Sequence, residues 1–205
     1  MQDIIQSKTF DNGIVTAAEQ SIVVDGPVAN EVKRELQKNG AYFMTEAESD
    51  RLGKLLFREN GRPDGEMAGK TAKYLAKRAR INVPEDTVLL VSEQRYVSDT
   101  NPYSREKLCP VLAYYVEDDW MHACEKCIEL LLSERRGHTL VIHSKDEEVI
   151  RQFALKKPVA RVLVNTPATF GGMGITTNLF PAMTLGSGST GRGSTSDNVS
   201  PMNLI

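Results

Sequence analysis

The sequence has 205 residues and a formal net charge of −2; 40% of the residues are hydrophobic and 25% are charged. This length suffices for one large domain or two small ones, and so small a net charge gives no support for a nucleic-acid partner. No apolar run approaches the roughly 20 residues that a membrane span requires, and three cysteines, an odd number, indicate a reduced, cytosolic protein.

The first feature along the chain is a candidate reactive loop within residues 7–21. A turn is predicted at its Asp-Asn-Gly sequence, residues 11–13, because Asn and Gly tolerate the positive φ angles of tight turns. Small side chains at residues 16–18 follow, and the apolar residues 22–24 then predict a buried strand. Such a loop lets backbone amides approach a ligand closely, although loops of this composition are far more often simple connections.

Helices and strands alternate along most of the chain. Apolar residues at helical spacing, with capping and stop signals, predict helices over residues 25–40, 46–57, 68–80, 118–135 and 146–157. Short apolar runs predict buried strands over residues 21–25, 88–91, 111–116, 139–143 and 159–165. This alternation predicts an α/β fold, a mostly parallel sheet with helices on both faces. The helix over 68–80 has a basic outer face, for which solvation is the simplest interpretation.

The composition changes at residues 166–205, which are rich in Gly, Ser and Thr. A flexible tail is one interpretation. Large apolar residues argue against it, because a solvated linker would not keep them; they are Ile175, Leu179, Phe180, Met183 and Leu185. We therefore expect ordered loops that pack on the domain and line a pocket.

The pair Cys124 and Cys127 has the Cys-x-x-Cys spacing of metal and redox sites. It lies inside a predicted helix, and no second Cys or His pair stands at ligand spacing; His122 does not complete a tetrahedral set. We therefore expect core cysteines and no metal site.

Several motifs resemble those of one enzyme family. Phe10-Asp11-Asn12-Gly13, then two apolar residues and one variable position, then Ala17-x-Glu19-Gln20-Ser21 resemble the nucleophile loop of CoA-acylating aldehyde dehydrogenases. These include acetaldehyde and propionaldehyde dehydrogenases and the aldehyde half of bifunctional aldehyde–alcohol dehydrogenases. In the family, the position of Thr16 holds the catalytic cysteine. A cysteine is partly thiolate near neutral pH, whereas a threonine hydroxyl needs an adjacent base to react.

Further roles follow from the same resemblance. Glu106 begins a Glu-x-x-x-Pro-Val segment, whose glutamate in the family binds the nicotinamide ribose hydroxyls of the cofactor. His138, in a Gly-His-Thr triplet, is a candidate catalytic residue, and a structural role is equally open. The implied substrate-pocket residues are Asn12, Gly13, Asn165, Ser187 and Gly188.

The resemblance covers residues 1–205 and implies an aldehyde dehydrogenase catalytic domain. Family members also carry an NAD-binding domain ahead of this one, so we expect a catalytic domain without it. The implied reaction is aldehyde + NAD⁺ + CoA → acyl-CoA + NADH through a cysteine thioester, with NAD as cofactor and coenzyme A as co-substrate.

The resemblance also implies partners and a location. The partners are a small aldehyde, the NAD-binding domain and further copies of the chain, without nucleic acid or membrane. The location is the cytoplasm, with a bacterial microcompartment left open. Because Thr16 replaces the nucleophile and the cofactor domain is missing, we expect this form to be inactive; a non-catalytic scaffold or oligomerisation module is the alternative.

Overall fold

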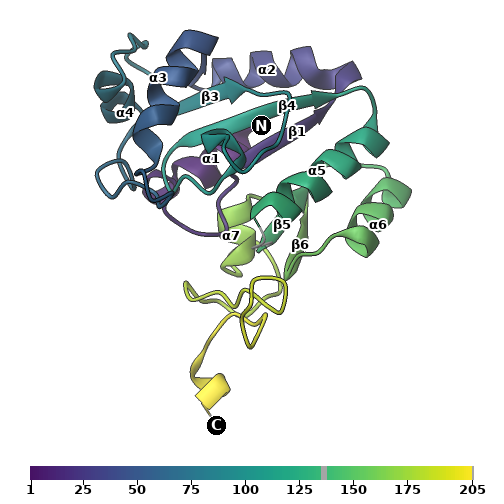
Figure 1. Cartoon of the computed structure of the whole chain (residues 1–205). Helices are drawn as coiled ribbons and strands as arrows, with labels where there is room; N and C mark the ends of the chain where they lie inside the picture. Colours follow the sequence, from purple (N-terminus) through teal and green to yellow (C-terminus); the bar gives the residue numbers. More distant parts are fainter. Residues whose placement is uncertain (135–137, 205) are drawn as a thin grey trace.

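A computed structural model describes residues 1–134 and 138–204 of the chain. Its main sheet is parallel and has the strand order β1-β4-β3-β2, and a second parallel sheet pairs β5 with β6 (Figure 1). The strands are β1 (Ser21–Asp25), β2 (Ala41–Met44), β3 (Leu89–Glu93), β4 (Val111–Glu117), β5 (Thr139–Ile142) and β6 (Arg161–Val164). The helices are α1 (Gln2–Thr9), α2 (Ala29–Lys38), α3 (Glu46–Leu56), α4 (Ala72–Arg78), α5 (Trp120–Glu134), α6 (Glu147–Lys156) and α7 (Ala168–Gly172).

Both faces of the main sheet are covered, which confirms the predicted fold class. Successive side chains of a strand point to opposite faces. Accordingly, Leu89 and Val91 of β3 pack with Leu36 of α2, whereas Leu90 between them packs with Leu52 of α3, and all these side chains are fully buried. A strand buried on both faces requires a continuous apolar run, which is the pattern that predicted β3.

Local signals set several element ends. Thr45 caps α3 in a capping box with Glu48, so each side chain accepts from the other residue's backbone N–H. The side chain of Thr71 accepts from the backbone N–H of Tyr74 and so caps the amino end of α4, which begins at Ala72. The helix predicted over 68–80 is therefore shorter. The side chain of Asp25, where the helix predicted over 25–40 was to begin, makes no capping hydrogen bond.

Three further features differ from the prediction. The helix α1 and the short strand β2 were not predicted, and β5 and β6 form a sheet of their own instead of extending the main one. Arg135, the predicted end of the helix from residue 118, lies outside the described residues.

The helix α7 lies inside the region expected to be loops, and after it the C-terminal region is built of packed loops, as expected. Leu185 and Asn198 pair as an isolated bridge, and buried Asn198 donates hydrogen bonds to the backbone oxygens of Gly172 and Phe180. Some of its apolar side chains nevertheless stay exposed, among them Ile175, Phe180 and Met183.

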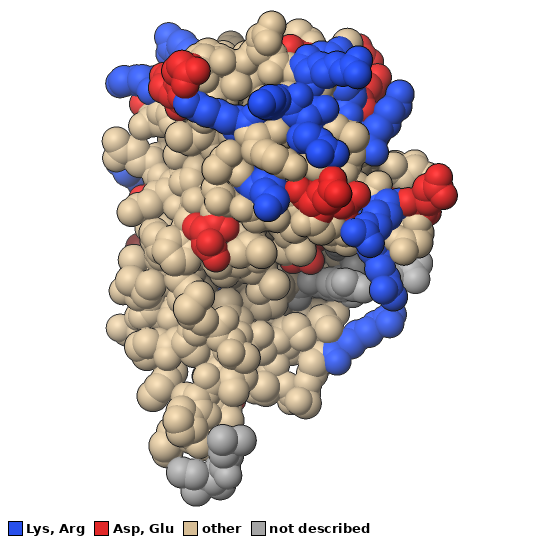
Figure 2. All heavy atoms as spheres, turned by 90° about the vertical axis from the view of Figure 1, so that its left-hand side faces the viewer, with Lys and Arg blue, Asp and Glu red and all other residues tan. Residues whose placement is uncertain are grey.

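Charge is unevenly spread over the surface. Figure 2 shows Lys and Arg side chains gathered on the part of one face where α3 and α4 lie, while the lower part of that face is almost free of charged side chains. Among the described residues, no helix is both long and apolar enough to span a membrane.

Candidate functional site

The turn within the candidate loop has a left-handed backbone. Asp11, Asn12 and Gly13 have φ angles of 45°, 51° and 72°. A Cβ atom at Gly13 would lie 2.9 Å from the backbone oxygens of both Lys8 and Cys109. Only glycine fits between these carbonyls, so the predicted turn is confirmed and Gly13 is needed for it.

Thr16 is exposed near the middle of the loop, and small side chains lie beside it. Ala17 and Ala18 are 3% and 4% exposed. A Cβ atom on Gly172 of α7 would lie 3.0 Å from the Cβ of Ala17, so the loop and α7 touch closely. The hydroxyl of Thr16 has no hydrogen-bond partner in the part of the chain that the structure describes.

Glu19 attaches the loop to α7. Its Oε1 accepts from the backbone N–H of Ala168 (3.1 Å) and its Oε2 accepts from the hydroxyl of Ser7 (2.6 Å). The Ser7 oxygen in turn accepts from the backbone N–H of Thr169 (2.8 Å). Burial raises the pKa of the Glu19 carboxyl, against these hydrogen bonds and the charge of Lys8.

Gln20 attaches the loop to the segment that enters β4. Its Oε1 accepts from the backbone N–H of Lys107 (3.0 Å) and from the Lys8 ammonium (3.3 Å). Lys8 is fully buried, and this burial lowers its pKa to about 8, although the nearby Cys109, Glu19 and Glu106 oppose the shift. The loop therefore rests on a buried polar network that includes a lysine.

Glu106 stands next to this network. It is half-buried and lines a pocket of about 450 Å³ together with Arg62, Arg105 and Phe57. Since Lys107 binds Gln20, Glu106 lies one residue from a contact with the candidate loop. The structure thus brings Asn12, Gly13, Thr16 and Glu106 together at the amino ends of β1 and β4.

The other candidate residues surround the second sheet. Asn165, with a φ of 49°, follows β6; its Oδ1 accepts from the backbone N–H of Ser144 (3.0 Å) and its Nδ2 donates to the Ser144 oxygen (2.8 Å). These bonds engage both ends of the Asn165 amide and join the loops after β5 and β6. α7 begins three residues later and carries the contacts with Ala17 and Glu19.

His138 lies at the start of β5 and is half-buried. Its Nδ1 is 2.7 Å from the Thr139 hydroxyl, and its pKa is lowered by burial and then by the charge of Arg161. Gly137 of the Gly-His-Thr triplet lies outside the described residues.

Ser187 and Gly188 belong to a compact loop on the same sheet. Gly188 has a φ of 62°, and a Cβ there would lie 3.0 Å from the Cβ of Ala160, just before β6. The Ser187 hydroxyl donates to the Gly191 oxygen (3.3 Å). These two residues are therefore grouped with β6, and α7 is the element between them and the Thr16 loop.

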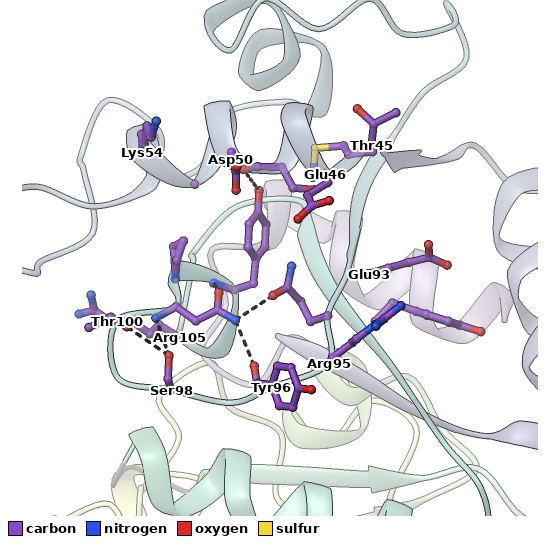
Figure 3. A pocket seen from close by; sticks show the side chains of 18 of the residues that line it. Thr45, Glu46, Asp50, Lys54, Glu93, Arg95, Tyr96, Ser98, Thr100 and Arg105 are labelled. Carbon is purple, nitrogen blue, oxygen red and sulfur yellow. Dashed lines mark hydrogen bonds between the residues drawn. The ribbon is translucent and has the colours of Figure 1, made fainter.

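Sequence reasoning missed the buried network and a wide groove. The groove, about 1240 Å³, lies between α3 and the loop after β3, and its lining includes Thr45, Glu93 and Tyr96 (Figure 3). It opens at the carboxyl ends of β2 and β3, opposite to the end where Thr16 lies. The polar residues of this network, Ser7, Lys8, Glu19 and Gln20, can be read from the sequence. No periodicity in the sequence, however, predicts that the lysine among them is buried.

The cysteines lie where the sequence placed them. Cys124 is buried and Cys127 half-buried on α5, and burial raises the pKa of Cys127 to about 12. Within the described residues, no group of three or more potential ligands could hold a metal ion.

Comparisons with known proteins point to one family. No protein-family model matches the chain. The aldehyde-alcohol dehydrogenase of Streptococcus pneumoniae is 36% identical over 99% of this chain, and the acetylating succinate-semialdehyde dehydrogenase of Clostridium kluyveri is 33% identical over 100% of it. Over its whole length the chain is homologous to acylating aldehyde dehydrogenases. It spans 24% of the first relative's length and 45% of the second's.

Solved structures of this family share the fold. An acetylating aldehyde dehydrogenase from Geobacillus thermoglucosidasius is 40% identical with a TM-score of 0.95, over 99% of this chain and 45% of its own. A propionaldehyde dehydrogenase from Rhodopseudomonas palustris, solved with bound CoA and an acylated cysteine, is 26% identical with a TM-score of 0.78, over 95% of this chain and 43% of its own.

Proposed function

We propose that this chain is the catalytic domain of a CoA-acylating aldehyde dehydrogenase in which Thr16 occupies the nucleophile's position. The observation that carries the proposal is the loop itself. Thr16 is exposed between a left-handed turn and a strand, and Glu19 and Gln20 hold the loop from two sides. The Rhodopseudomonas palustris relative was solved with bound CoA and an acylated cysteine, which supports the proposal.

Residues of this chain could bind the cofactor and stabilise the oxyanion in this reaction. When bound, NAD⁺ would accept the hydride of the aldehyde and CoA would take up the acyl group. Glu106, at its pocket, has the carboxylate that would accept hydrogen bonds from ribose hydroxyls. Backbone N–H groups of the loop would stabilise the oxyanion that forms when a nucleophile at position 16 adds to a carbonyl.

The NAD-binding part and further copies of the chain belong to the same proposal. The relatives are two to four times longer than the matched segment, which leaves room for a cofactor domain in them. His138, Asn165, Ser187 and Gly188 would then act around the second sheet, with Asn165 shaping the loop before α7.

One observation favours the alternative of a non-catalytic scaffold. Within the described residues the Thr16 hydroxyl forms no hydrogen bond to a base, and an unactivated hydroxyl is a poor nucleophile at neutral pH. The unmodified chain should therefore not form an acyl-enzyme, even though its loop keeps the backbone conformation described above.

Acylation by a thioester tests the proposal without the cofactor domain. In Thr16→Cys, the new thiolate should attack the carbonyl carbon of propionyl-CoA; the bond to the CoA sulfur breaks, and CoA leaves as a thiolate that takes a proton from water. Intact-mass and peptide mass spectrometry should find one propionyl group, at position 16.

The unmodified chain and Thr16→Ser are the controls and should stay unmodified. Propionylation of Cys109 or Cys127 ahead of position 16, or of none, would contradict the proposed role of the loop.

A further inference from the structure

Cys124 and Lys157 form a polar contact in the apolar interface between α5 and α6. The Nζ of Lys157 lies 2.5 Å from the Sγ of Cys124 and donates a hydrogen bond to it. Cys124 is 7% exposed, and it packs with Phe153 of α6 and Ile142 of β5 in one apolar cluster. The contact therefore joins two helices that pack beside the second sheet (Figure 1).

The amine of Lys157 is held at the sulfur by the end of α6. Lys157 directly follows the last residue of this helix and stands four positions after Phe153, so the two side chains can meet on one side of it. The Nζ lies 4.3 Å from the centroid of the Phe153 ring, whose face attracts a cation. Among the described residues, no carboxylate forms an ion pair with Lys157. The amine is thus directed at the ring and the sulfur and not at an acid.

The separation of the two atoms suits one bridging oxygen. An oxygen atom bonded to both would hold nitrogen and sulfur at about this distance, because each bond to oxygen is short and the angle at oxygen is bent. The side chains of Cys124 and Lys157 could therefore be joined without a movement of either helix.

The other thiols are poorer partners for Cys124. An oxidised cysteine, once it is a sulfenic acid, condenses with a second thiol to a disulfide, and the thiolate is the reactive form of that thiol. Burial raises the pKa of Cys127 to about 12, although the charge of Lys157 opposes the shift, so Cys127 stays protonated near neutral pH. Cys109 belongs to a different apolar cluster, against the main sheet. Lys157 is therefore the better-placed nucleophile.

We propose that Cys124 and Lys157 form a modification site at which hydrogen peroxide joins the two side chains through an N–O–S bridge. One peroxide takes two electrons from the sulfur, whose S–H becomes S–OH, and one water leaves. After the ammonium has lost a proton to solvent, a second peroxide takes two electrons from the nitrogen. The O–H bond of the sulfenic acid and one N–H bond then break, the N–O bond forms, and two waters leave.

The bridge would fasten α5 to the end of α6 beside the second sheet. A cross-link restricts the unfolded chain, whereas in the folded chain the two atoms are already in contact. The bridged form should therefore resist unfolding more than the reduced form. Two molecules of dithiothreitol would return the thiol and the amine and release the bridging oxygen as water. The site is separate from the Thr16 loop, so it does not depend on the proposed function.

Peptide mapping after peroxide treatment of the unmodified chain tests the bridge. Trypsin cleaves after Lys126, so Cys124 and Cys127 fall on separate peptides. Without a reductant, mass spectrometry should find the peptide of Cys124 joined to that of Lys157, with the mass of the pair increased by one oxygen and decreased by two hydrogens. Dithiothreitol should abolish this species.

Three variants separate the bridge from general oxidation. Lys157→Met keeps an apolar stem but removes the amine, so the cross-link should be lost and dimedone should trap the sulfenic acid at Cys124 instead. Cys127→Ser keeps both partners and should give the same yield of cross-link as wild type. Lys145→Met, at an exposed position just before α6, is the control for loss of a lysine and should also give that yield.

Urea unfolding provides a second measurement. Peroxide should raise the unfolding midpoint of wild type and of Cys127→Ser, dithiothreitol should reverse the rise, and Lys157→Met should show none. The proposal would be overturned by a disulfide between Cys124 and Cys127, or by a cross-link to Lys157 without the added oxygen. A rise in the midpoint of Lys157→Met equal to that of wild type, or dimedone trapping at Cys124 in wild type equal to that in Lys157→Met, would also overturn it.

Discussion

The side chain at position 16 decides what chemistry the loop can perform. The three native cysteines provide internal references, because burial raises the pKa of Cys109 to about 11 and that of Cys127 to about 12. Both thiols are therefore almost fully protonated at neutral pH and poor nucleophiles. A thiol at the exposed position 16 would not have its pKa raised by burial in this way.

In the variant Thr16→Cys, the new thiol should accordingly be the most reactive one in the chain. Amides of the loop around it would stabilise a thiolate and lower its pKa. Iodoacetamide labelling as a function of pH, followed by peptide mapping, should show position 16 modified first near neutral pH, and Cys109 and Cys127 only at alkaline pH. A position-16 thiol that labels no faster than Cys109 would show that the loop is not preorganised.

Lys8 should make stability depend on alkaline pH. Its pKa is about 8 in the folded state against 10.5 for an unperturbed lysine, and burial is the main cause. Between these values the unfolded state binds more protons, so this residue makes the free energy of unfolding rise with pH from about 8 to 10.5. Urea unfolding at several pH values should show wild type gaining stability relative to Lys8→Met across that window. A constant difference between the two proteins would contradict the assignment.

At the scale of elements, α7 joins the two sheets. Glu19 binds the first amide of α7 while Ala17 touches Gly172 within it, and α7 follows directly on β6. The Thr16 loop and the second sheet, which holds His138, are thus linked through one short helix. A displacement of α7 should therefore alter both the Thr16 loop and the second sheet.

The variant Glu19→Ala should release this link. It leaves the backbone N–H of Ala168 without its acceptor and removes one of the two acceptors of the Ser7 hydroxyl, which costs about 1–3 kcal/mol of unfolding free energy. Hydrogen exchange should speed up for Ala168 and Thr169 more than for β4. Glu31→Ala, on the exposed side of α2, is the control and should change neither quantity; exchange that rises equally in β4 would contradict a local link.

At the scale of the molecule, the surface is divided by charge. The cations gather over α3 and α4, whereas the C-terminal loops carry little charge and expose large apolar side chains (Figure 2). Ile175, Phe180, Met183 and Met202 are 64%, 58%, 72% and 67% exposed. Where such side chains form one patch, the patch marks an interaction site.

We expect the chain to self-associate through these loops. Phe180→Lys together with Met183→Lys should increase the fraction of monomer in size-exclusion chromatography with light scattering. The reason is that burying a lysine charge in the interface at either position is unfavourable. Leu155→Lys, at a 68% exposed apolar position on α6, is the control and should not change that fraction. A strictly monomeric wild type at high concentration would contradict the expectation.

The sequence by itself determined what depends on neighbouring residues. The turn at Asp11–Gly13 follows from the backbone preferences of Asn and Gly, and its positive φ angles are observed. The apolar run of β3 predicted a strand buried on both faces, and helix ends such as Thr45 were set by local hydrogen bonds. The family resemblance also rests on short motifs, and the comparisons bear it out over the whole chain.

Tertiary structure decided what depends on residues far apart in the chain. Lys8 is fully buried only because the Thr16 loop and the entry to β4 close over it, and no pattern around residue 8 predicts that. Glu19 and Ala168 are 149 positions apart, yet their hydrogen bond attaches the loop to α7. Likewise, the sequences of β5 and β6 predict buried strands but do not show which strands they pair with. They form a separate sheet because strand pairing is settled by packing among distant segments, whereas turns and caps are settled by neighbours.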